Sequence, residues 1–295
     1  MGNSTWLSAT YTSYATSVLG NGSKTVEEIC NTSDLNPDMN PKVIQMRESR
    51  DSDSNPESTA IIIGLDVTGS MSCVIHPIIN KLDTFVTELY KRKPITNPHL
   101  MFMGIGDVDC DYAPIQMTQF EADIKIAEQL QKIYIEGGGG GNSYESYTYA
   151  WYAALRKTAI DCYEKRTKKG YIFTIGDENP NPEIDIKSAK EFLNLKEDKA
   201  ISSADLLTLV SEKYNVYHCV VVDGAYCKTN KAEVIKSWNN LLGQNTILIH
   251  DYTKIPEIII SRIQMNEGES LESVVASWDP SLSDDIKNSV IDFRS

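Results

Sequence analysis

The sequence lacks an excess of positive charge and any apolar run long enough to cross a bilayer. Its 28 Lys and Arg residues are outnumbered by 41 Asp and Glu residues, which gives a net charge of −13. Nucleic acids and anionic membrane surfaces attract basic proteins, so this balance disfavours both as partners. Residues 1–17 also lack the basic and apolar regions of a secretion signal. We therefore expect a cytoplasmic protein that binds neither a membrane nor nucleic acid.

Paired cysteine motifs are absent as well. The cysteines are scattered along the chain, at Cys30, Cys73, Cys110, Cys162, Cys219 and Cys227. None belongs to a C-x-x-C pair and no histidine spacing accompanies them, which disfavours a zinc site. Disulfide scaffolds are typical of much smaller secreted domains. We expect reduced thiols, as in a cytoplasmic protein.

Polar segments flank a central region in which hydrophobic residues are periodic. Residues 1–58 are rich in loop-forming residues, with one short strand expected at 42–46. This N-terminal extension is either a partly ordered leader or an arm that docks on a neighbouring molecule. Residues 59–266 form the expected domain. Residues 267–295 form a C-terminal tail, which we expect to be helical after Ser283 and to dock on its own domain.

The central region alternates predicted strands and helices. The apolar runs predict strands at 60–66, 99–107, 113–117, 171–177, 215–223 and 245–251. Amphipathic patterns predict helices at 77–89, 120–133, 143–169, 203–214, 231–243 and 254–263. Such alternation indicates an α/β fold with a doubly wound, mostly parallel sheet flanked by helices.

Acidic and hydroxyl side chains follow the predicted strands. In α/β sheets of this kind, ligands bind beyond the carboxyl ends of the strands. The side chains expected at that edge are Asp66, Thr68, Ser70, Asp107, Asn142 and Asp177. Loops that follow different parallel strands would bring these groups together.

The alternation Asp66-x-Thr68-x-Ser70 places three oxygen ligands on a tight loop. Hydroxyl ligands with few carboxylates leave a hard cation short of negative charge, so it accepts a further oxygen ligand from outside. Mg²⁺ suits such a site best, and Mn²⁺ is the alternative. Asp177 would add a second carboxylate, through water. A simpler interpretation is that these residues cap the following helix, although capping needs only one of them.

Three separated segments resemble one known family. GLDVTGSMS (64–72) looks like the D-x-S-x-S motif of von Willebrand factor type A (VWA) domains, with Thr68 in place of the first Ser. Residues 104–155 are similar to the middle of bacterial and phage VWA proteins, where a Gly-rich loop precedes a helix with an early Glu. YIFTIGDENP (171–180) resembles the strand and Asp loop that complete the metal-ion-dependent adhesion site. The resemblance covers roughly residues 59–265.

The resemblance implies a Rossmann-like VWA fold with a bound Mg²⁺ or Mn²⁺, whose coordination is completed by an Asp or Glu of a partner protein. It implies no catalysis. The metal ligands carried over to this chain are Asp66, Thr68, Ser70, Asn142 or Ser143, and Asp177. The alternative after the Gly-rich loop arises because many family members have Thr there, and this chain has Asn142 followed by Ser143. Asp107 and Glu145 are expected behind the ligands, where they would orient them.

Two other functions are open at this point. In one, the fold is the scaffold of a structural assembly protein of a phage or prophage particle, with contacts made by residues 1–58 and 267–295, and the protein lies in the virion. In the other, the chain is a metal-dependent phosphohydrolase of the haloacid dehalogenase type. That chemistry requires D-x-D, and here the second carboxylate is replaced by Thr68.

Two local patterns fail as motifs of their own. The alternating Asp107, Asp109 and Asp111 start like a calcium-binding EF-hand loop, but Tyr112 and Thr118 stand where Gly and Glu are required. We interpret them as a solvated loop near the site. The glycines at 137–141 are not followed by the lysine of a phosphate-binding loop. We expect them to bend around the metal site with backbone angles that other residues avoid.

Overall fold

The structure is a computed structural model that describes residues 4–19, 24, 28, 30, 32–71, 77–137, 141–196 and 198–291, without the side chains of residues 70, 290 and 291. Its centre is a six-stranded sheet in the order β12-β11-β7-β2-β3-β4. The strands are β12 (Thr246–Ile249), β11 (Tyr214–Val221), β7 (Gly170–Gly176), β2 (Thr59–Asp66), β3 (Pro98–Ile105) and β4 (Ile115–Met117). All neighbours are parallel except β3 and β4. The mostly parallel sheet predicted from the sequence is confirmed.

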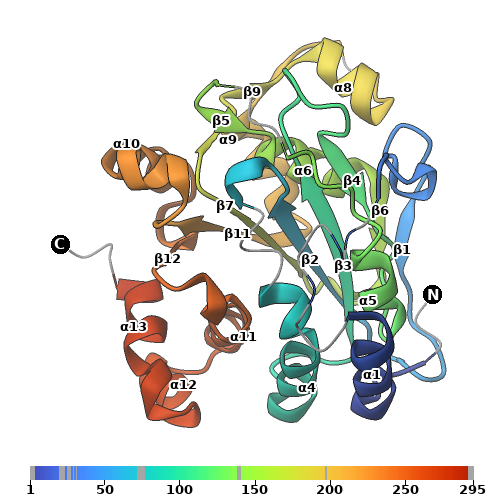
Figure 1. Cartoon of the computed structure of the whole chain (residues 1–295), viewed down its shortest axis with the longest axis vertical. Coiled ribbons are helices and arrows are strands. Elements are labelled where there is room, and N and C mark those ends of the chain that lie inside the picture. Colours follow the sequence, from blue (N-terminus) through green and yellow to red (C-terminus); the bar gives the residue numbers. More distant parts are fainter. Residues whose placement is uncertain are drawn as a thin grey trace.

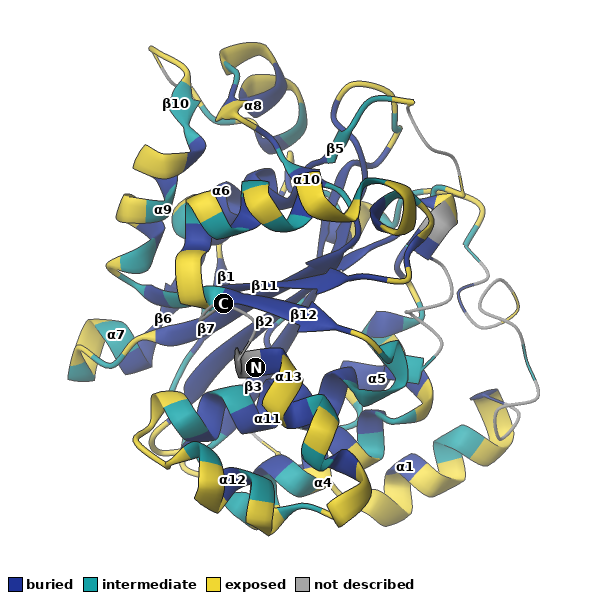
Figure 2. Cartoon of the chain, turned by 90° about the vertical axis from the view of Figure 1, so that its left-hand side faces the viewer, coloured by how far each residue is buried: buried dark blue, intermediate teal, exposed yellow. Residues whose placement is uncertain are grey.

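Helices cover both faces of this sheet (Figures 1 and 2). One face carries α4 (Leu82–Arg92), α5 (Lys125–Leu130) and α11 (Ile255–Asn266), and the other carries α6 (Tyr147–Lys157), α9 (Ser203–Ser211) and α10 (Ala225–Leu242). Each helix buries an apolar side against the sheet, so the predicted flanking by helices is also confirmed.

The sheet separates two hydrophobic cores, and its strand β2 contributes side chains to both. Every residue of it is buried, as expected for a parallel strand covered on both faces. Ile61 and Ile63 point into the core under α4 and α11, whereas Ala60 and Ile62 point into the core under α6 and α10. This alternation fixes the register of β2 and therefore the position at which Asp66 leaves the sheet.

The helix predicted over residues 143–169 is wrong, because four shorter elements replace it, of which strand β5 (Tyr144–Glu145) is the first. Helix α6 ends at Lys157, residues Thr158–Ile160 form strand β6, and α7 runs over Asp161–Arg166. Strand β6 pairs in parallel with β1 (Arg47–Ser49). The break depends on this distant partner, which a local helical pattern does not register. The short strand predicted at 42–46 is also wrong. The strand of this segment is β1, which begins at Arg47, where its partner β6 pairs with it.

Other element bounds differ less. Helix α5 is shorter than the predicted 120–133, and α10 begins before the predicted 231 and contains a kink at Asn230. Smaller elements of the central region are α8 (Ile186–Leu193), the pair β9 (Glu183–Ile184) and β10 (Ile201–Ser202), and the pair β5 (Tyr144–Glu145) and β8 (Asn179–Pro180).

The described parts of both terminal segments pack on the central domain. Helix α1 (Ser8–Tyr14) lies beside α4 (Figure 1), where Trp6 Nε1 donates to Asp83 at 2.8 Å and the Tyr11 hydroxyl donates to the Ile79 carbonyl at 2.7 Å. Helices α12 (Leu271–Ser277) and α13 (Ser283–Ile291), from the C-terminal segment, pack beside α11. Within the described residues, each segment therefore contacts its own chain.

Candidate metal centre

The predicted side chains converge where the strand order reverses. Strand β2 lies between β3 and β7, so the chain leaves β2 toward β3 and returns later to β7. Asp66 ends β2, Asp177 directly follows β7, and Asp107 lies two residues beyond β3. These parallel strands end at one edge of the sheet, which is the usual ligand site of such folds.

Asp66 organises this edge through its two carboxylate oxygens. Its Oδ1 accepts hydrogen bonds from the Thr68 backbone N–H at 3.0 Å and from the Thr68 hydroxyl at 2.6 Å. Its Oδ2 accepts from the Tyr147 hydroxyl at 2.7 Å. Because the Thr68 proton points at Asp66, the lone pairs of that hydroxyl stay available to a cation. Ser70 lies in the short helix η4 (Gly69–Met71), and its side chain is outside the described part of the structure.

The Gly-rich loop reaches the same edge through Asp107. Asp107 is fully buried, and its Oδ2 accepts from the Asn142 amide at 2.6 Å. Gly137 and Gly141, which flank the undescribed residues 138–140, have φ angles of +65° and +69°. These values confirm, for those two glycines, the predicted need for a backbone that other residues avoid.

Ser143, the alternative ligand, is tied to the loop after β7. Its carbonyl accepts from the Asn179 backbone N–H at 3.2 Å and from the Asn179 side chain at 2.8 Å. These bonds bring the Gly-rich loop beside the Asp177 loop. Asn142 and Ser143 are thus both held at this edge, and the choice between them as ligand stays open.

Asp177 is fully buried and faces the turn that precedes α10. Its Oδ2 accepts from the Tyr226 backbone N–H at 2.8 Å. A Cβ at Gly224 would lie 2.3 Å from the Asp177 Cβ, so only glycine permits this approach. The turn before α10 therefore holds Asp177 in place. Asp177 follows β7, whereas Asp66 ends β2 and Asp107 follows β3.

Several carboxyl groups lie close together at this edge of the sheet. Asp66, Asp107, Glu145 and Glu178 form no ion pair with any described Lys or Arg. Burial, and then the charge of Asp177, raises the pKa of Asp66, although hydrogen bonds from Thr68 and Tyr147 oppose the shift. A bound cation would favour the ionised carboxylates.

Glu145 and Glu178 each bury a carboxylate oxygen at this edge. Glu145 is 1% exposed, and Oε2 of each residue is buried without a hydrogen-bond partner among the described residues. Burial, followed by the charges of neighbouring carboxylates, raises the pKa of Glu145. The same causes raise the pKa of Glu178 to about 8. Protonation of these two carboxyl groups, or a cation bound near them, would relieve the repulsion between the charges.

Sequence reasoning missed Tyr147 and Glu178 as members of the site. Tyr147 is fully buried in the core, and its hydroxyl also contacts Asp66. No local pattern gives that contact, because α6 approaches from a different part of the chain. Glu178 directly follows Asp177, and this adjacency was the available signal.

The alternating aspartates beyond β3 form a turn that is only partly solvated. Asp109 is exposed and Asp111 is half-buried, whereas Asp107 is fully buried. The interpretation as a solvated loop is therefore wrong for Asp107. Asp111 Oδ2 accepts from the Asp107 backbone N–H at 2.7 Å, which closes the turn.

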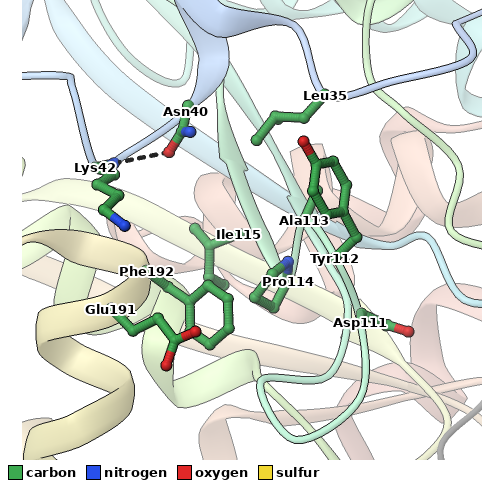
Figure 3. A pocket seen from close by; sticks show the side chains of 10 residues that line it. All are labelled: Leu35, Asn40, Lys42, Asp111, Tyr112, Ala113, Pro114, Ile115, Glu191 and Phe192. Carbon is green, nitrogen blue, oxygen red and sulfur yellow. Dashed lines mark hydrogen bonds between the residues drawn. The ribbon is translucent and has the colours of Figure 1, made fainter.

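A cavity of about 350 Å³ lies next to this turn (Figure 3). Asp111 stands at one end of it, Pro114 and Ile115 form part of its floor, and Glu191 and Phe192 project from α8 at the other end. The carboxyl edge of the sheet is thus bordered by a recess with aromatic and charged walls.

Within the described residues, no three His, Cys, Asp or Glu side chains are grouped so that they could hold a metal ion. The predicted ligand set contains only two carboxylates, and its other members are hydroxyl or amide groups. In the same part of the chain, no helix has both the length and the apolar character that a membrane span requires.

No protein-family model and no curated protein matches this chain. Among solved structures it is similar to the pilus adhesin SpaC from Lactobacillus rhamnosus GG in its open conformation, with a TM-score of 0.46 and 9% identity over 75% of this chain and 31% of the adhesin. It is also similar to proximal thread matrix protein 1 from the mussel byssus, with a TM-score of 0.44 and 11% identity over 71% of this chain and 46% of that protein. This chain thus spans less than half of either.

Proposed function

We propose that the chain is a VWA-type protein-binding module in which a Mg²⁺, or alternatively a Mn²⁺, at the carboxyl edge of the sheet accepts an Asp or Glu from a partner protein. Thr68, Ser70 and either Asn142 or Ser143 would bind the ion directly. Asp66 would add a carboxylate oxygen, since the one hydrogen bond that its Oδ2 accepts leaves a second lone pair there, and Asp177 would act through water. The proposal keeps the cation short of charge, so that it attracts an outside carboxylate.

One observation supports this proposal above the others. Asp66, Asp107 and Glu145 are each at most 1% exposed, yet none forms an ion pair with a described basic residue. Buried carboxylates without a counter-charge destabilise a fold unless they are protonated or bound to a cation. Their location where the strand order reverses is also where α/β sheets bind ligands.

The proposal includes no catalytic step. A phosphohydrolase of the type considered above would use Asp66 as nucleophile and a second carboxylate at position 68 as acid and base. Here position 68 is a threonine whose hydroxyl donates to Asp66. The role as an assembly protein is a separate prediction, for which the described residues supply no specific support.

Thermal unfolding in the presence of metal tests the proposed site. Protein freed of metal should show a higher midpoint as Mg²⁺ or Mn²⁺ is added, because an ion that binds only the native state stabilises it by about 2.7 kcal/mol at 100 times its Kd. Asp66→Ala should remove this response. Asp109→Ala is the matched control, since it removes an exposed carboxylate from the neighbouring turn. A metal response that survives in Asp66→Ala would contradict the proposal.

A further inference from the structure

A second polar cavity lies apart from the metal edge. It encloses about 320 Å³ between residues 36–39, the start of β1, the loop after β4, and α5 with the residues that follow it. Its polar lining consists of Asn36, Asp38, Arg47, Gln119, Gln129 and Lys132. None of these residues belongs to the metal edge. In a chain with a net charge of −13, two of the three charged groups that line this cavity are positive.

Arg47 is the buried centre of this cavity. It is 8% exposed, and its Nη2 donates to the Met117 carbonyl at 3.0 Å and to the Asp38 carbonyl. Its Nε is buried without a hydrogen-bond partner, and Arg47 forms no ion pair with a described carboxylate. A desolvated guanidinium in this state favours an added anion, because it has lost water and no described carboxylate bonds to it directly.

Two neighbouring side chains strengthen the case for a ligand. The Gln119 side-chain amide makes no hydrogen bond within the described residues, and its Oε1 is buried. Lys132 is exposed at the cavity rim and places a second positive charge there. Gln129, by contrast, is held by the Gln119 backbone N–H and by Glu121. The cavity thus offers a guanidinium, an ammonium and an unused amide.

We propose that this cavity binds a small oxyanion, a carboxylate or a phosphate group, between Arg47 and Lys132. Both Nη2 protons are taken by the Asp38 and Met117 carbonyls, so Nη1, which makes no hydrogen bond within the described residues, would donate to one oxygen of such a group, and the Lys132 ammonium would supply a point charge. Gln119 would contribute its amide. Asp38 opposes binding, because its carboxylate also lines the cavity and acts on Arg47 through space.

Isothermal titration calorimetry with sodium phosphate and sodium acetate, each as a separate arm, tests this site. The buffer should be freed of metal on a chelating resin, since soluble chelators are themselves carboxylates. Saturable binding of one anion per chain is expected, and the tighter arm identifies phosphate or carboxylate. Lys132→Met should weaken it about three- to tenfold, and Asp38→Asn should strengthen it at least about twofold.

Two further variants make the result decisive. Lys125→Met removes an exposed positive charge from α5 that does not line the cavity, so it should leave the affinity unchanged. Arg47→Met should abolish binding, with circular dichroism to check that the chain still folds. The proposal is overturned if neither anion binds the wild type saturably. It is also overturned if Lys132→Met and Asp38→Asn bind with the wild-type affinity.

Discussion

At the scale of single residues, Asp66 connects the groups that surround the proposed ion. It accepts from Thr68 on one oxygen and from Tyr147 on the other. The first contact is local and follows from the loop after β2. The second contact comes from Tyr147 of α6 and orients the Asp66 carboxylate. Groups that orient ligands in this way commonly contribute a factor of about 10–100 to metal affinity.

Tyr147→Phe tests this orienting role. The substitution removes a buried hydroxyl that donates to Asp66 at 2.7 Å. We expect the free energy of unfolding to fall by about 1–3 kcal/mol, since a buried acceptor loses its partner. We also expect Mg²⁺ affinity to fall about tenfold. Chemical denaturation and calorimetric titration measure the two effects.

Tyr149→Phe is the matched control for that experiment. Tyr149 lies on the same helix as Tyr147, but its hydroxyl donates to Asp185 at 2.7 Å, away from the metal edge. Stability should fall, but Mg²⁺ affinity should not change. Equal losses of affinity in the two variants would mean that Tyr147 acts only through general stability.

The pH dependence of the metal-free protein follows from the raised pKa values at the edge. A carboxyl whose pKa is raised on folding binds more protons in the native state, so stability falls as pH rises from its unfolded pKa to its folded one. For Glu178 that window runs from the usual glutamate pKa of 4.5 to a pKa of about 8. Asp66 and Glu145 act in the same direction.

Glu178→Gln isolates this effect. Burial lowers the pKa of His99 to about 4, and it also lowers the pKa of His218, so both histidines act with the opposite sign up to about pH 7. Comparing the variant with wild type at each pH removes their contribution. Between pH 6 and 8 the free energy of unfolding should fall more steeply with pH in wild type than in the variant. The two slopes should differ by at most about 1.4 kcal/mol per pH unit. Parallel curves would contradict the raised pKa of Glu178.

At the scale of elements, the sequence predicts what local periodicity encodes. Strand β2 is a short apolar run buried on both faces, and its residues alternate between the two cores. Its end, and hence the place of Asp66, was predicted for that reason. Strand β6 was not, because Thr158–Ile160 is extended only where β1 pairs with it. Contacts from distant segments, such as Tyr147 with Asp66, are likewise absent from any local pattern.

The segment that carries β1 is held to α7 by Asp51. This side chain accepts from Arg166 Nη1 at 2.7 Å and from the Ser58 hydroxyl at 2.9 Å. Burial alone would raise the pKa of Asp51, but the hydrogen bonds from Arg166 and Ser58 outweigh it and lower the pKa. Its stabilising contribution is therefore present above its unfolded pKa near 4 and is lost as pH falls.

Asp51→Asn should lower the free energy of unfolding at pH 7 by about 1–3 kcal/mol, because it weakens a partly buried ion pair. The difference from wild type should shrink as pH falls below about 4. Urea denaturation at both pH values measures it. Asp53→Asn, at an exposed position of the same segment, should have little effect. An equal loss in both variants would show that Asp51 has no special role in holding this segment.

At the scale of the whole molecule, the metal edge and two cavities lie at different places around one central sheet. The metal edge combines loops after β2, β3 and β7. The cavity beside Asp111 borders that edge, and the cavity around Arg47 lies between the N-terminal segment and α5. A molecule with net charge −13 can attract an acidic partner only if a local cation reverses the field. The proposed binding of an acidic partner therefore depends on the ion.

The most direct test is a titration with Mn²⁺, followed by electron paramagnetic resonance, with and without acetate as a stand-in for the partner carboxylate. Wild type should bind one Mn²⁺ per chain, Mg²⁺ should displace it, and acetate should tighten the binding, since each ligand must affect the other equally. Asp66→Ala should bind Mn²⁺ at least about tenfold more weakly. Absence of Mn²⁺ binding by wild type, or equal affinity in Asp66→Ala, would contradict a metal centre at this edge.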